Sequence, residues 1–128
     1  MLDINFSKVV IYTNFNCNLR CKYCVAHSQF RTKDDDYNIE DIKKDILYLM
    51  SLENSEIKEF NIIGGEPLLY PHLKELLEFL SKFNKRIVIM TNGVLLKQCN
   101  FLLKYFNKNT SNEIAVSNYK LKKCFRFL

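Results

Sequence analysis

The sequence lacks the features that would place it outside ordinary single-domain proteins. Its longest apolar runs, at 9–12 and 87–90, fall far short of the roughly 18 residues of a transmembrane helix. Residues 1–6 include an acidic side chain and no basic one, so they do not resemble a secretory signal. With only three glycines and two prolines, collagen-like and low-complexity chains are excluded. We expect one cytoplasmic domain over residues 1–128, without a membrane segment.

Charge is plentiful but unevenly placed. The formal net charge is +5, with −2 in residues 1–64 and +7 in residues 65–128. A basic half can attract nucleic acid. However, its lysines are scattered along predicted helices, and Arg86 and Arg126 are its only arginines. The pattern therefore argues against a nucleic-acid partner and says little about others.

Short β-branched runs alternate with segments in which apolar residues recur at helical spacing. We expect strands at 7–13, 57–63, 86–91 and 113–117, and helices at 38–52, 71–83 and 95–107. Strands that alternate with helices of this length favour a parallel sheet with right-handed crossovers, covered on both faces. The fold class is therefore α/β.

Three of the five cysteines are gathered directly after the first predicted strand, as Cys17-x3-Cys21-x2-Cys24. A disulfide framework is disfavoured because the chain shows no secretory signal. Three thiolates can hold three irons of a four-iron cluster and leave the fourth iron open to another ligand. A second reading stays open, in which His27 completes a Cys3His zinc site.

Special residues also follow the other three strands. They are Gly64-Gly65-Glu66-Pro67, Thr91-Asn92-Gly93 and Ser117. In parallel α/β folds the loops at the carboxyl ends of the strands share one rim, so we expect these segments to meet the cysteines. The two glycines lack Cβ atoms and should let backbone approach a ligand closely, while Glu66 offers a carboxylate to a cationic group. Replacing Gly65 by valine should then block the ligand and spare the cluster.

The cysteine pattern followed by Gly-Gly-Glu-Pro resembles the radical S-adenosylmethionine (SAM) superfamily, from about Val9 to Tyr119. The resemblance implies a [4Fe–4S] cluster held by Cys17, Cys21 and Cys24, with SAM bound to the open iron. It also implies reductive cleavage of SAM to methionine and a 5′-deoxyadenosyl radical, which abstracts hydrogen from a substrate. A reductant such as a flavodoxin or ferredoxin is the implied partner.

The same resemblance assigns further residues to SAM. Tyr23 matches an aromatic position beside adenine, and the Gly-Gly-Glu-Pro loop would receive the methionine amino group. Thr91 and Asn92 would line the site, and Ser117 stands where a polar side chain meets ribose or carboxylate. The assigned SAM residues are Tyr23, Gly64, Gly65, Glu66, Pro67, Thr91, Asn92 and Ser117.

The family core is a partial barrel of roughly six βα units, whereas this sequence supplies four strands and three helices. We therefore expect an incomplete parallel (β/α) barrel, truncated after the fourth strand, with residues 120–128 as an aberrant tail. Three hypotheses remain: a radical SAM enzyme or its partner-completed half, a truncated and inactive remnant that still binds a cluster, and a non-catalytic zinc module. The sequence does not indicate the substrate.

Overall fold

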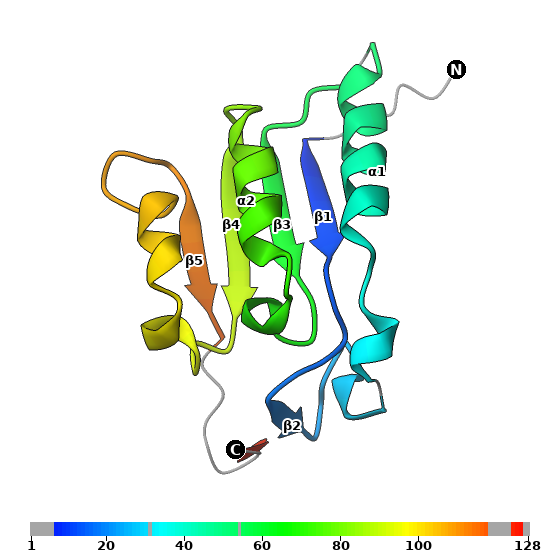
Figure 1. The fold of residues 1–128 in the computed structure, drawn as a ribbon, viewed down its shortest axis with the longest axis vertical. Coiled ribbons are helices and arrows are strands. Elements are labelled where there is room, and N and C mark those ends of the chain that lie inside the picture. The colour runs from blue at the N-terminus through cyan, green and yellow to red at the C-terminus, as the bar shows by residue number, and fades with distance from the viewer. Residues whose placement is uncertain (1–6, 31, 54, 118–123, 127–128) are drawn as a thin grey trace.

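A four-stranded parallel sheet forms the body of the protein. The computed structural model describes residues 7–30, 32–53, 55–117 and 124–126. The strand order is β1-β3-β4-β5. Their bounds are β1 Lys8–Tyr12, β3 Glu59–Ile63, β4 Arg86–Thr91 and β5 Glu113–Val116. Figure 1 shows the four arrows side by side and pointing the same way. The predicted parallel sheet of an incomplete α/β barrel is confirmed.

Two α-helices follow the predicted apolar patterns. Helix α1 spans Ile39–Ser51, and its N-cap Asn38 accepts a hydrogen bond from the Glu40 amide through its side chain. Such a cap satisfies one of the free amides of the first turn. Helix α2 spans Leu73–Ser81 and buries one apolar face. Both helices lie within the predicted ranges, although α2 is shorter at each end.

The third predicted helix, at 95–107, is not an α-helix. The structure forms two short 3-10 segments there, η4 at Leu96–Gln98 and η5 at Asn100–Lys104. Cys99 separates them with a φ of −108° and a ψ of 56°, which are not helical values. The apolar spacing identified the side that packs on the core, but it did not distinguish an α-helix from two 3-10 turns.

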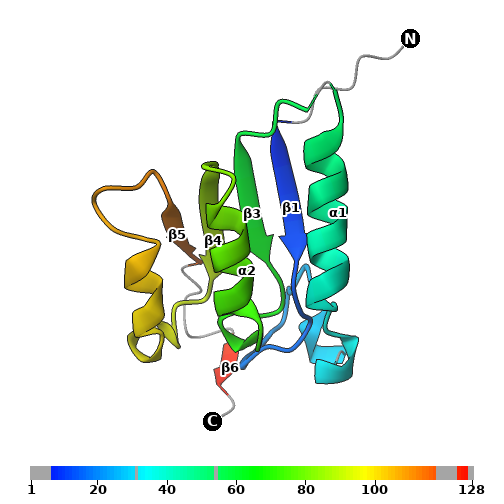
Figure 2. The ribbon, with the colours of Figure 1, turned by 45° about the horizontal axis from the view of Figure 1, so that its top comes forward.

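The helices cover one face of the sheet. Ile11, Ile62 and Ile89 lie in one row across three neighbouring strands and are buried by the helices. Figures 1 and 2 show α2 in front of β3 and β4, and α1 beside β1. Each fully buried side chain of this size stabilises the fold by about 1.5–3 kcal/mol. This one-sided core holds the strand ends, and therefore the site, in place.

The opposite face of the sheet is open, which corrects the expectation that both faces are covered. Among the described residues, no helix lies on it, and Val10, Tyr12 and Met90 are exposed. These side chains alternate with buried ones along their strands, as a sheet covered on one face requires.

A small antiparallel pair adds to the parallel sheet. It joins β2, Leu19–Cys21, to β6, Cys124–Arg126. The sequence predicted no strand at either place, because β2 lies within the cysteine loop and residues 124–128 show no periodicity. Of the predicted tail at 120–128, residues 120–123 and 127–128 lie outside the described residues, as do Asn118 and Tyr119 before it. None of the helices in the described part of the chain is long and apolar enough to cross a membrane.

Candidate cofactor site

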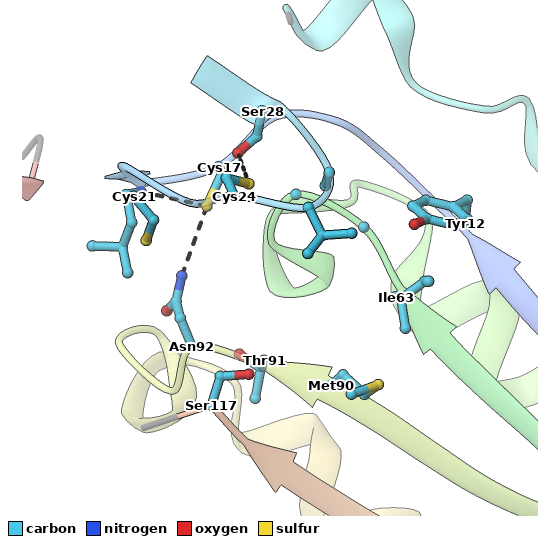
Figure 3. A pocket seen from close by; sticks show the side chains of 15 residues that line it. Tyr12, Cys17, Cys21, Cys24, Ser28, Ile63, Met90, Thr91, Asn92 and Ser117 are labelled. Atoms are coloured by element: carbon cyan, nitrogen blue, oxygen red, sulfur yellow. Dashed lines mark hydrogen bonds between the residues drawn. The ribbon is translucent and has the colours of Figure 1, made fainter. Parts of the chain in front are cut away.

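The three clustered cysteines face one pocket at the carboxyl ends of the strands. The pocket has a volume of about 230 Å³. Of the predicted site residues, eight line it: Cys17, Cys21, Cys24, Gly64, Gly65, Thr91, Asn92 and Ser117. Figure 3 shows Asn92, Thr91 and Ser117 across the pocket from the cysteines. The shared rim expected from parallel strands is present.

The loops that follow β1 and β3 are joined by backbone hydrogen bonds. The Gly65 amide donates to the Asn14 carbonyl at 2.7 Å, and the Glu66 amide donates to the Asn16 carbonyl at 2.8 Å. The buried Asn14 side chain adds bonds from Nδ2 to the carbonyls of Asn16 and Glu66. The cysteine loop and the Gly-Gly-Glu-Pro loop therefore form one rigid unit.

This junction also shows why both positions require glycine. A Cβ on Gly64 would lie 2.4 Å from Asn14 Oδ1, and one on Gly65 would lie 2.4 Å from the carbonyl oxygens of Phe15 and Asn16. The space beside each glycine is thus filled by the cysteine loop itself. A side chain at Gly65 would displace that loop, so a valine there cannot spare the cluster ligands.

The Glu66 carboxylate is buried beneath the rim. Its Oε1 accepts hydrogen bonds from Thr91 Oγ1 at 2.7 Å and from the Leu68 amide at 3.0 Å. Its Oε2 accepts from the Asn92 amide at 2.9 Å. The residue is 0% exposed and does not line the pocket. In this geometry the carboxylate ties the loop that follows β4 to the loop that follows β3.

Asn92 connects that loop to the cysteines. Its Nδ2 donates to Asn18 Oδ1 at 2.8 Å and lies 3.9 Å from Cys17 Sγ. Its Oδ1 accepts from the Val94 amide at 3.0 Å. Both ends of the amide are used, so its orientation is fixed. Figure 3 marks the contact with Cys17 by a dashed line.

The thiols differ in their electrostatic surroundings. Burial raises the pKa of Cys17, the Leu19 amide opposes this, and the nearby Glu66 and Cys24 raise it further. At Cys24 burial also acts upward, but hydrogen bonds from the Ser28 side chain and nearby backbone amides outweigh it and lower the pKa. Cys24 is therefore the readier of the two to lose its proton when a metal binds.

The donor set suits an iron–sulfur cluster better than a single zinc ion. Cys17, Cys21 and Cys24 all line one pocket. Among the described residues, no three His, Cys, Asp or Glu side chains converge closely enough to hold one metal ion. A four-iron cluster takes its thiolates on separate irons and so accepts more widely spaced ligands. The Cys3His alternative loses its support, since His27 is exposed and does not line the pocket.

Two other predicted site residues lie away from the pocket. Tyr23 is 75% exposed and Pro67 is buried at the start of η3, Pro67–Leu69, so neither lines it. Two residues that the sequence analysis missed contribute to the site. Asn14 binds the two loops together, and Ser28 places its hydroxyl 3.2 Å from Cys24 Sγ. Only the position of Ser28, four residues after Cys24, could have drawn attention to it.

A parallel half-barrel that carries a three-cysteine loop at its rim defines the structural class, and comparison with known proteins gives the family. Residues 11–117 match the family described as the Radical SAM superfamily. The chain belongs to this superfamily. Its members use a [4Fe–4S] cluster and SAM, and these are the cofactors of the chain.

Individual relatives agree with this assignment. A putative glycyl-radical enzyme activating enzyme of Methanocaldococcus jannaschii is 27% identical over 98% of the chain and 51% of its own length. The GTP 3′,8-cyclase of Aquifex aeolicus is 32% identical over 82% of the chain and 32% of its own length. The present chain therefore spans about half of the first relative and about a third of the second.

Solved structures show the same fold. Streptococcus suis SuiB bound to S-adenosylmethionine superposes with a TM-score of 0.67 at 24% identity, covering 86% of this chain and 24% of SuiB. SuiB bound to the precursor peptide SuiA gives a TM-score of 0.65 at 23% identity. At this identity the likeness concerns the fold.

Proposed function

We propose that Cys17, Cys21 and Cys24 hold the [4Fe–4S] cluster and that SAM binds at the open iron. The observation that carries the proposal is that all three cysteines of the motif and the Gly-Gly loop line one pocket. Once bound and reduced by a flavodoxin or ferredoxin, the cluster would supply the one electron needed to cleave SAM to methionine and a 5′-deoxyadenosyl radical. A cluster of cysteine ligands of this kind suits a reducing compartment such as the cytoplasm.

The chain's own residues position these groups. The backbone of Gly64 and Gly65 lines the pocket where the methionine end of SAM would lie. Asn92 Nδ2 lies 3.9 Å from Cys17 Sγ, and Ser117 lines the pocket beside Thr91, whose carbonyl accepts from the Ser117 amide at 2.8 Å. Tyr23 is exposed on the cysteine loop, so its ring is accessible for stacking on adenine. Glu66 acts indirectly, by fixing the loop that carries Asn92.

Anaerobic reconstitution with iron and sulfide tests the cluster. We expect the wild-type chain to take up a [4Fe–4S] cluster and Cys17→Ser, Cys21→Ser or Cys24→Ser to lose it. Cys99→Ser and Cys124→Ser are matched controls that should retain iron. Uptake of one zinc and no iron, or equal loss of iron in the controls, would refute the assignment.

Turnover is a separate proposal, because the chain covers only part of its relatives. Within the described residues, β5 pairs with β4 alone and the face carrying Tyr12 and Met90 is open. We propose that further strands are needed to enclose SAM and substrate, either in a longer chain or in a second polypeptide. The test is 5′-deoxyadenosine formation by the loaded chain supplied with SAM and reductant. We expect little product, and robust turnover by a monomer would refute the need for further strands.

A further inference from the structure

Ser28 is buried beside the cysteines although it belongs to no motif of the sequence. It is 1% exposed and lines the pocket, and its Oγ lies 3.2 Å from Cys24 Sγ. Figure 3 shows the dashed contact between the two side chains. A buried hydroxyl needs a hydrogen-bond partner, and here that partner is a cysteine sulfur.

A tight turn brings the hydroxyl to this place. The His27 amide donates to the Cys24 carbonyl at 3.1 Å, and His27 has a φ of 51°, in the left-handed region. This conformation is uncommon for a residue other than glycine. It reverses the chain so that η1, Ser28–Phe30, begins with its first side chain directed at Cys24. The turn that places Ser28 beside Cys24 therefore includes a disfavoured backbone conformation at His27.

The direction of the hydrogen bond follows from the chemistry of a ligand thiolate. In the free protein either atom could donate. A cysteine bound to iron has lost its proton, so only the serine hydroxyl can then donate. A hydrogen bond to sulfur withdraws electron density and stabilises the more negative, reduced state of a cluster. Hydrogen bonds to the sulfurs are among the factors that set cluster potentials.

We propose that Ser28 is a positioning residue for the cluster, whose O–H···S bond to Cys24 raises the midpoint potential. This inference rests on the proposed function, since it requires the cluster to bind at Cys24. The contact is shorter than those to Cys17 Sγ, where the Leu19 amide lies at 3.4 Å and Asn92 Nδ2 at 3.9 Å. Compared with Cys17, Cys24 therefore has the closer hydrogen-bonding neighbour.

The experiment is a potentiometric titration of the reconstituted chain, followed by the electron paramagnetic resonance signal of the reduced cluster. Ser28→Ala should bind as much iron as the wild type and show a more negative midpoint potential. Ser28→Thr keeps the hydroxyl and should restore the potential toward the wild-type value. Ser81→Ala is the matched control, because the Ser81 hydroxyl is exposed on α2 and bonds to the Glu78 carbonyl.

The outcomes separate this inference from the proposed function. An unchanged potential in a fully loaded Ser28→Ala protein would overturn the role of Ser28 while leaving the cluster assignment intact. Failure of Ser28→Ala to load, beside a loaded wild type and Ser81→Ala, would also overturn it, because the serine would then serve assembly. If the wild type itself takes up no iron, the proposed function fails first.

Discussion

Gly65 is the position where the smallest change should disturb both the fold and the cofactor site. A Cβ there would lie 2.4 Å from the carbonyl oxygens of both Phe15 and Asn16. These are backbone atoms, which cannot swing aside as the end of a side chain can. We expect Gly65→Ala to force the two loops apart and to break the hydrogen bonds from Gly65 to Asn14 and from Glu66 to Asn16.

The magnitude follows from these contacts. Overpacking of a close-packed interior costs about 1–3 kcal/mol, and each lost backbone hydrogen bond costs about 0.5–1.5 kcal/mol. With two such bonds at stake, the free energy of unfolding should fall by about 2–6 kcal/mol. A domain is typically stable by only about 5–15 kcal/mol. The substitution should therefore remove a large part of the stability and much of the iron uptake.

Urea denaturation of the metal-free chain under reducing conditions measures this loss, and iron content after reconstitution measures its effect on the site. Gly93→Ala is the control. Its added Cβ would meet the side chain of the exposed Val116 at 2.9 Å, and Gly93 has a φ of 79°. Backbone strain there should cost about 1–2 kcal/mol. A Gly65→Ala chain within about 0.5 kcal/mol of the wild type, the range of ordinary surface changes, would refute the reasoning.

Three further predictions concern groups that support the site and the sheet. Glu66→Gln places an amide NH2 group against the Thr91 hydroxyl or the Asn92 amide, which are themselves donors. The free energy of unfolding should fall by about 1–3 kcal/mol. Unchanged urea stability and SAM affinity would contradict this. Lys8 holds the pKa of Glu59 below its ordinary value of 4.5. The ionised Glu59 carboxylate therefore stabilises the folded protein above pH 4.5, and this contribution is lost as the pH falls through the lowered pKa. The difference in free energy of unfolding between the wild type and Glu59→Gln should therefore shrink in acid. A difference that stays constant from about pH 7 to about pH 3, where carboxyl groups titrate, would contradict this prediction. Tyr70→Phe removes a 2.7 Å hydrogen bond to the Tyr37 carbonyl and should lower stability by about 1 kcal/mol, as urea midpoints would reveal.

The sequence predicted the sheet and the rim of the site because both depend on short-range patterns. Four β-branched runs separated by helical spacing imply parallel strands, and parallel strands bring their carboxyl ends together. For that reason Cys17, Gly64, Thr91 and Ser117, which are far apart in the chain, could be assigned to one pocket from the order of the strands alone. At these positions tertiary packing did not override the local pattern, as it did at 95–107.

The roles of individual side chains could not be predicted in the same way. Glu66 looked like a ligand group, yet its carboxylate is occupied by Thr91 and Asn92, about 25 residues further along the chain. The sequence also did not reveal that a side chain at Gly64 or Gly65 would meet the cysteine loop. Such assignments depend on which residues, distant in the sequence, lie within hydrogen-bond distance in the folded protein. The periodicity of the sequence does not indicate these partners.

The amino and carboxyl ends of the parallel strands differ in the groups that they offer to a ligand. At the amino ends of the strands, Glu59 binds Lys8 at 3.1 Å and Arg86 at 2.8 Å, and Arg86 also pairs with Glu113. These alternating charges satisfy one another across four strands, so this end has little capacity left for a charged ligand. At the carboxyl ends the pocket presents thiols, amides, hydroxyls and glycine backbone. These groups can coordinate a cluster and hydrogen-bond to a zwitterionic cofactor, so the cofactors belong at this end of the sheet.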